Sequence, residues 1–228
     1  SRRLSASSTG ARLLGYPHYV GTIHAFVNQF LALPLLRSDG EAVDVVDNEI
    51  FAAQALSLLR TKWTLNAWVR NNPQRGPAAI ASLRYQGADL TLGYEDGGLP
   101  GPGTASWTEA QQLKDRLRAK GVFRFDDMFA FAKRLLVRFP DLPKRLSHRF
   151  PLVLIDEMQD TSWAQEDLLA RLFDDTVVMQ RYGDRNQRIL SSGTDAARLT
   201  FPRPQPLNVT STKRFPESIA AVVRAVQE

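Results

Sequence analysis

The stretch PLVLIDEMQDTS, residues 151–162, sets an apolar run directly against acidic side chains. The run predicts a buried strand over residues 150–155, with Pro151 tolerable because it lies near the start. Asp156 and Glu157 follow at once, and the capping-box pattern of residues 162–165 predicts a helix directly afterwards. Open α/β sheets bind ligands outside the carboxyl ends of their strands. The two carboxylates therefore stand at a possible ligand site, although a solvated acid pair stabilised by the helix dipole explains a bare Asp-Glu better.

A second apolar segment, TVVMQRYG at residues 176–183, repeats this arrangement. Asp184 and Gln187 follow it and would also lie at the carboxyl end of a strand. Residues 207–209 are a candidate third strand, and a helix is expected from about Glu217. Short strands joined by helical crossovers predict an α/β fold, with a parallel sheet covered by helices on its faces.

The upstream half of the chain is predicted to be mainly helical. A helix is expected to begin after Thr22, a plausible N-cap, and another to run from residue 47 to 69. Residues 71–105 are expected to form loops around one short helix, because they are rich in Gly and Pro. A capping-box pattern at residues 106–109 predicts a helix to about Lys120, and an amphipathic helix follows over 125–139. The tryptophans at 63, 68, 107 and 163 could be platforms for base stacking, but core packing is commoner, so they are interpreted as core residues. Arg60, Lys62 and Arg70 are interpreted as a solvated helix face.

The composition excludes several kinds of metal site and gives no sign of a membrane protein. The chain has no cysteine, which excludes disulfides and thiolate metal sites, and its three histidines are too scattered to suggest a zinc site. No apolar run approaches the roughly 20 residues of a membrane helix. We therefore expect a cytoplasmic protein without a membrane partner. The net charge of +5 permits a polyanionic partner such as nucleic acid.

Taken in chain order, several motifs resemble those of the UvrD/Rep family of superfamily 1 helicases. The resemblance rests on the motifs Gly21-Thr22-Ile23-His24, Asp156-Glu157-Met158-Gln159-Asp160, Gly183-Asp184 with Gln187 and Ile189, and Arg214 with Ile219. The helix start FRFDDMF, residues 123–129, is also similar to one that precedes the acidic motif in this family. The resemblance covers roughly residues 20–228.

The resemblance implies a RecA-like P-loop NTPase motor domain that uses ATP and Mg²⁺ and acts on single-stranded or partial duplex DNA. It implies that Asp156 holds Mg²⁺ and that Glu157 activates the attacking water. Asp156, Gln159 and Asp184 would bind the nucleotide, and Gln159 and Asp160 would link the nucleotide state to neighbouring motifs.

The resemblance also implies roles for four more residues. Gln187 would sense the γ-phosphate, Arg214 would neutralise charge developing on it, and Thr22 and His24 would contact single-stranded DNA. Each has a structural alternative, since His24 could be a hydrogen-bonding residue of the fold, Arg214 a surface charge and Gln187 a loop cap.

The chain departs from the family pattern at two places. It contains no G-x-x-x-x-G-K-[ST] motif, which the family carries upstream of Gly21, and no aromatic residue follows Gln187 in the run Ile189–Gly193. We therefore expect an N-terminally incomplete motor domain that by itself hydrolyses ATP poorly and works with the remainder of a helicase chain in repair, recombination or defence. The alternative is a non-catalytic nucleic-acid-binding or interaction module that keeps the fold.

The same patterns predict three divisions of the chain. Residues 1–45 and 121–228 would form the motor domain, and residues 46–120 a helical insertion subdomain. The predicted helices of residues 47–69 and 106–120 account for most of that insertion.

Overall fold

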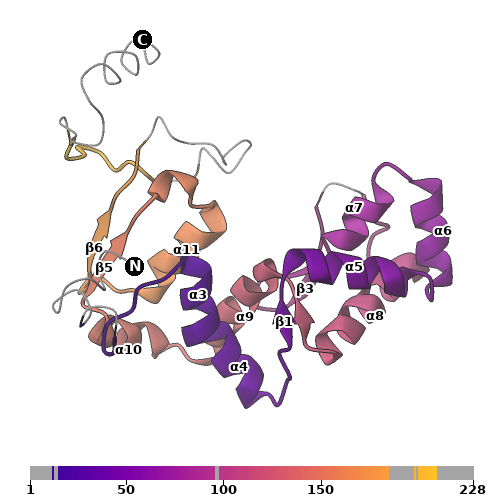
Figure 1. Cartoon of the computed structure of the whole chain (residues 1–228), viewed down its shortest axis with the longest axis horizontal. Coiled ribbons are helices and arrows are strands. Elements are labelled where there is room, and N and C mark those ends of the chain that lie inside the picture. The colour runs from indigo at the N-terminus through magenta and orange to yellow at the C-terminus, as the bar shows by residue number, and fades with distance from the viewer. Residues whose placement is uncertain (1–11, 13–14, 96–97, 185–197, 199, 210–228) are drawn as a thin grey trace, which may run out of the picture. The chain divides into compact units, whose positions relative to one another are not determined.

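The computed structural model describes Arg12 and residues 15–95, 98–184, 198 and 200–209. The chain divides into two compact units, residues 1–149 and residues 150–228, which we call unit 1 and unit 2 (Figure 1). The domain boundaries at 45/46 and 120/121 stay predictions. Among the described residues, no helix has the length and apolar character needed to cross a membrane.

Unit 2 is built on two parallel strands joined by a helix. The strands β5 (Leu152–Ile155) and β6 (Val178–Arg181) pair over their whole length, from Leu152 opposite Val178 to Ile155 opposite Arg181. Between them lie a short 3₁₀ helix, η2 (Met158–Asp160), and the helix α11 (Trp163–Leu172). Ser162 and Gln165 form the predicted capping box at the start of α11. The predicted order of strand, helix and strand is therefore confirmed.

Two expectations about the strands of unit 2 are wrong. The run in β5 was expected to be wholly buried, but Leu152 and Leu154 are 54% and 58% exposed, while Ile155 on the other face is buried. Residues 207–209 do not form a strand, and the side chain of Leu207 is fully exposed. An extended segment becomes a strand only when a neighbour pairs with its backbone, and none of the described residues pairs there.

The first helical segment of unit 1 begins where the sequence predicts. Thr22 caps it, because its Oγ1 accepts a hydrogen bond of 3.1 Å from the backbone N–H of Ala25. The segment runs as α3 (Ile23–Val27), a π-helical turn η1 (Asn28–Ala32) and α4 (Leu33–Ser38). The widened turn directly precedes Pro34, which has no backbone N–H to donate. This segment packs against α9 (Phe125–Arg138).

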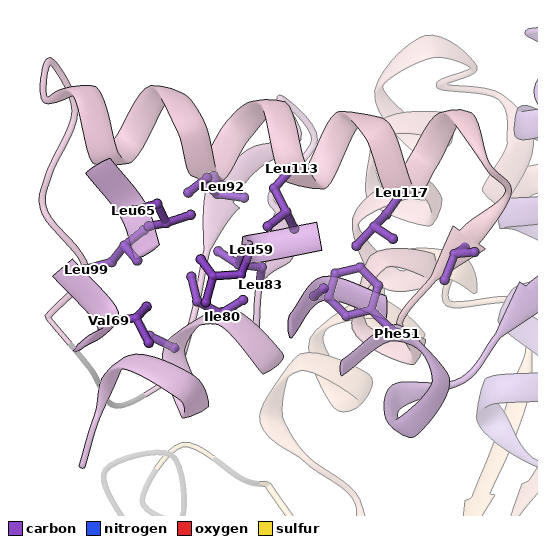
Figure 2. Close-up of a cluster of buried hydrophobic side chains, with 14 residues drawn as sticks. Phe51, Leu59, Leu65, Val69, Ile80, Leu83, Leu92, Leu99, Leu113 and Leu117 are labelled. Carbon is purple, nitrogen blue, oxygen red and sulfur yellow. The ribbon is translucent and has the colours of Figure 1, made fainter. Parts of the chain in front are cut away.

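Most of the remaining elements of unit 1 form a largely helical group. They are β1 (Val45–Val46), α5 (Asn48–Leu59), α6 (Trp63–Asn71), α7 (Gly76–Ala81), β2 (Arg84–Gln86), β3 (Thr91–Gly93), α8 (Ala105–Ala119) and β4 (Val122–Phe123). The last helix of unit 1 is α10 (Leu142–Arg149). Side chains from α5 to β4 enclose one apolar core, shown in Figure 2. Strands β1 and β4 pair in parallel, so the two ends of the segment that connects them lie side by side.

Local details of this group differ from the sequence predictions in three ways. The helix expected over 47–69 is interrupted between Leu59 and Trp63, which gives α5 and α6. The cap of α8 is Thr104 and not Ser106, because the Thr104 hydroxyl accepts a hydrogen bond of 3.2 Å from the N–H of Trp107. Glu109 accepts instead from the N–H of Leu65 at 2.8 Å. The antiparallel hairpin of β2 and β3 lies where loops were expected.

A fully buried ion pair joins α8 to α9. Lys114 Nζ lies 2.6 Å from Asp127 Oδ2, and the two side chains are 1% and 0% exposed. Asp127 also accepts hydrogen bonds from the backbone N–H groups of Tyr85 and Arg124, at 2.7 and 2.8 Å. Lys114 donates to the carbonyl of Leu83 and lies over the ring of Phe51. Burial lowers the pKa of Lys114 to about 8, and the facing carboxylate opposes that shift.

We predict that Asp127→Ala lowers the free energy of unfolding by about 3–5 kcal/mol, since it leaves a buried cation unpaired. It also removes the acceptor of two buried backbone N–H groups. Urea unfolding measures the change. The control is Asp141→Ala, which breaks an exposed pair with Arg145 in the same unit and should cost less than about 1 kcal/mol. Equal losses in the two variants would contradict the prediction.

Candidate nucleotide site

The acidic pair lies at the carboxyl end of β5, as the sequence predicts. The carbonyl of Ile155 accepts from the N–H of Tyr182 at 2.8 Å, and the N–H of Met158 donates to the carbonyl of Tyr182 at 2.9 Å. In a regular parallel ladder the second bond would come from residue 157, so one extra residue is accommodated here. This bulge leaves both Asp156 and Glu157 exposed at the strand end.

Glu157 adopts a left-handed backbone conformation at the bulge. Its φ is 53° and its ψ is 40°, in a region that costs a residue with a side chain roughly 1–2 kcal/mol. Its N–H no longer joins the ladder and donates instead to Oδ1 of Asp156 at 3.0 Å. Strained conformations of this kind persist where the surroundings hold them, and they cluster at functional sites.

Gln159 connects the ends of the two strands. Its side chain is 4% exposed, and its Nε2 donates to Oε2 of Glu157 at 2.5 Å. Its Oε1 accepts from the backbone N–H of Asp184 at 3.0 Å. A Cβ on Gly183 would lie only 2.4 Å from that same oxygen, so the contact requires glycine at position 183. The side chain of Glu157 is therefore linked to the segment that follows β6.

A buried polar cluster under β6 was not found by sequence reasoning. Glu166 on α11 is 3% exposed and accepts from Arg181 Nη1 at 2.7 Å and from the N–H of Thr200 at 3.1 Å. Arg181 also donates to Thr200 Oγ1 at 2.8 Å. The cluster fixes the residues on both sides of the segment 182–199. Nothing in the local sequence distinguishes Glu166 from the exposed acids around it.

The remaining predicted site residues of unit 2 are either exposed or lie outside the described residues. Asp160 is exposed, and its backbone N–H donates to the carbonyl of Glu157 at 3.0 Å. The side chain of Asp184 is exposed at the end of β6. Gln187 and Arg214, with Ile189 and Ile219, lie outside the described residues, and so does the helix expected from Glu217.

Thr22 and His24 belong to unit 1. The hydroxyl of Thr22 is used as the cap of α3. His24 is partly buried, with its ring edge-to-face against Phe125 and Phe129 at centroid distances of 5.7 and 5.2 Å. Burial lowers the pKa of His24, and the charge of Asp126 opposes that shift. The imidazole is therefore mainly neutral at pH 7 and has both a packing role and a partly open surface.

The sequence matches a known family. The family model for the UvrD/REP helicase N-terminal domain matches residues 16–191, which include Thr22, His24, the bulge at Asp156–Glu157, and Asp184. The chain belongs to this family. The predicted family resemblance is confirmed, and the match stops short of Arg214.

A curated relative of this UvrD/REP-type domain is an ATP-dependent helicase/nuclease subunit from Streptococcus sanguinis (strain SK36). The two sequences are 38% identical over 65 residues, which is 27% of this chain and 5% of the relative. The match thus spans only a small part of that relative's length.

The acidic residues of this UvrD/REP-type domain suit a magnesium ion better than a metal held by protein groups alone. The described part of the chain holds no group of three or more His, Asp or Glu side chains placed to hold a metal. Mg²⁺ usually keeps several waters and takes only one or two carboxylates, with substrate phosphates as further ligands. The exposed carboxylate of Asp156 fits that requirement.

We predict that the His24 imidazole titrates below the ordinary histidine pKa of 6.5 and that Asp126→Asn lowers its pKa further. Because the folded pKa is depressed, the unfolded chain takes up the proton first as the pH falls. Stability is therefore full above 6.5 and declines as the pH falls from 6.5 through the folded pKa. NMR titration of the imidazole resonances measures both pKa values. A higher pKa in Asp126→Asn would contradict the assignment.

Proposed function

We propose that the chain is part of the motor of an ATP-dependent DNA helicase or translocase, which couples ATP hydrolysis to movement along single-stranded DNA. The proposal includes a RecA-like motor domain with a helical insertion over residues 46–120, working with the remainder of a helicase polypeptide in the cytoplasm. Family membership supports it, and one observation carries the site chemistry. The side chain of Glu157 is held on a bulge at the carboxyl end of β5 and is bonded through Gln159 to the segment after β6.

In this proposal Asp156 and Glu157 divide the chemistry between them. Asp156 would hold Mg²⁺, which would supply neutralisation of the phosphate charge of ATP when bound. Glu157 would accept the proton of a water molecule as the water oxygen bonds to the γ-phosphorus and the bond from that phosphorus to the bridging oxygen breaks, which releases ADP and phosphate. The proton would stay on the Glu157 carboxyl until it returns to solvent. The left-handed backbone of Glu157 supports this role, because the residue leaves the ladder of strand hydrogen bonds and its side chain is exposed.

Gln159 would transmit the state of the site. It donates to the Glu157 carboxylate and accepts from the backbone N–H of Asp184. A movement of the Glu157 side chain would therefore displace the backbone at Asp184, and the reverse. Gln187 follows Asp184 by three residues and is proposed to sense the γ-phosphate. Arg214 is proposed to neutralise the transition state, and Asp160 to help join the acidic motif to its neighbours.

Contact with DNA is proposed for Thr22 and His24. Residues 21 and 22 are exposed at the start of α3, and the ring of His24 is only partly covered by Phe125 and Phe129. A neutral imidazole with one open face can stack on a base or hydrogen-bond to it. Single-stranded DNA, or a partial duplex that presents a single strand, is the proposed substrate.

We predict that Glu157→Gln slows ATP hydrolysis by about 10²- to 10⁴-fold in the helicase polypeptide that carries this chain, while ATP binding is kept. The amide has nearly the shape of the carboxylate and can still accept from Gln159, so packing should survive. Nucleotide affinity and single-turnover hydrolysis measure the two effects. The matched control is Glu49→Gln, an exposed acid on α5. Turnover near the unmodified rate would contradict the role of Glu157.

Two further variants separate the remaining roles. Asp156→Asn is expected to weaken Mg²⁺-dependent nucleotide affinity, because it removes a charge that holds the metal. Arg214→Ala is expected to slow the hydrolytic step with little change in affinity, because its charge would act in the transition state. Identical profiles for the two variants would contradict this division and favour a non-catalytic module.

We also predict that the chain binds single-stranded DNA with an affinity that falls steeply as salt is added. Phosphate contacts release counterions, so log K declines linearly with log salt concentration. Fluorescence anisotropy with a labelled oligonucleotide measures the slope, and His24→Ala should weaken binding at every salt concentration. Absence of binding at low salt would contradict the proposed DNA contact.

A further inference from the structure

One segment of the chain carries an excess of positive charge because it lacks acidic residues. Residues 50–88 contain no Asp or Glu and five cations, namely Arg60, Lys62, Arg70, Arg75 and Arg84. Their sum of +5 equals the net charge of the whole chain, so all the other residues together are neutral. A segment of this kind within a folded unit gives a local electrostatic attraction for anions.

Two of these five cations have a side-chain partner in the structure, and three have no ion pair with a described residue. Arg84 pairs with Glu95, and Lys62 Nζ donates to Gln112 Oε1 at 2.7 Å. The side chains of Arg60, Arg70 and Arg75 are exposed and make no ion pair with any described residue. These three guanidinium groups lie before, within and just after helix α6.

Trp63 departs from the expectation that the tryptophans are core residues. It begins α6 and is 86% exposed, whereas Trp68 and Trp107 pack against the apolar core. A tryptophan ring this exposed contributes little to folding, because most of its apolar area stays in water. The exposure of Trp63 is therefore not explained by a role in folding.

Helical spacing brings the ring and a cation to one face. Trp63, Ala67 and Arg70 are four and three residues apart and all exposed, while Leu65 and Val69 are buried against the core. We call Trp63, Ala67 and Arg70 the α6 face. At 1.5 Å per residue, Trp63 and Arg70 lie about 10 Å apart along the helix. Figure 1 shows α6 at the end of the helical group away from α9.

We propose that the α6 face binds single-stranded nucleic acid, with a base stacked on Trp63 and phosphates bound by Arg70 and the flanking Arg60 and Arg75. Aromatic rings beside cations are the usual means of binding a single strand without sequence preference. A protein partner would need a contiguous apolar centre, whereas this face offers one large apolar group among polar ones. The surface is additional to the Thr22 and His24 contact and uses none of the ATP chemistry proposed above.

Intrinsic tryptophan fluorescence of the complete chain tests this proposal. Oligothymidylate of about 12 nucleotides is expected to quench emission, because a stacked base quenches the indole. Trp63→Phe should remove most of the quench, and Trp163→Phe in unit 2 should leave it unchanged. Trp63→Ala should weaken binding at least about fivefold, with an unchanged melting temperature.

Charge variants test the phosphate contacts. Arg70→Gln and Arg75→Gln should each reduce the slope of log K against log salt concentration by about 0.7. Lys120→Gln removes the same charge from the exposed C-cap of α8 and should leave the slope unchanged. An equal effect of Lys120→Gln would overturn the assignment of the contacts to the α6 face.

Three other outcomes would also overturn the proposal: a full quench in Trp63→Phe, no binding of the oligonucleotide, or an equal quench by polyglutamate at the same concentration. The last would indicate an acidic protein segment as the partner. Failure of the function proposed above is distinguishable, because a loss of ATP hydrolysis or of His24-dependent binding leaves the Trp63 quench in place.

Discussion

The parallel pairing of β5 with β6 is the constraint on which the candidate nucleotide site depends. Two backbone hydrogen bonds to Tyr182, from either side of Asp156 and Glu157, continue the ladder past the ends of the strands. Since one more residue than a regular ladder allows lies between them, the backbone bulges and Glu157 takes a left-handed conformation. The exposure of both carboxylates follows from this arrangement.

Polar contacts connect the bulge to its surroundings. Gln159 joins Glu157 to Asp184 and requires glycine at position 183. Glu166 and Arg181 hold Thr200 in place beneath β6. These bonds join α11, the end of β6 and Thr200, and Nε of Arg181 is buried there without a hydrogen-bond partner. The site therefore combines a strained backbone with a network of polar contacts.

Unit 1 is held in a different way. An apolar core fills the helical group, and the buried carboxylate of Asp127 joins α8, α9 and the start of β2 at one point. Because that interior is well filled, exposed groups of the same unit stand out. Trp63 and the three arginines around α6 that pair with no described acid are the main examples. They are the basis for proposing a second surface that binds nucleic acid.

Features with short-range causes were predictable from the sequence. The capping box at Ser162, the cap at Thr22, the strands at 152–155 and 178–181 and the order of the family motifs all depend on neighbours within a few residues. The position of the acidic pair at a strand end follows from the same local pattern. The coarse α/β order of unit 2 and the place of the acidic pair at a strand end could therefore be predicted, and the family match confirmed the family.

Details that depend on residues distant in the sequence could not be predicted from the sequence. Glu109, expected to close a capping box at the start of α8, instead accepts from the N–H of Leu65, 44 residues away. The contact of Gln159 with Asp184, the burial of Glu166 and the exposure of Trp63 likewise depend on which segments pack together. The sequence by itself determined the strands, the caps and the acidic motif, because these are set by local backbone preferences and hydrophobic pattern. Only the tertiary structure decided which of several chemically similar side chains are buried, paired or open to solvent, because burial is a property of the packed units.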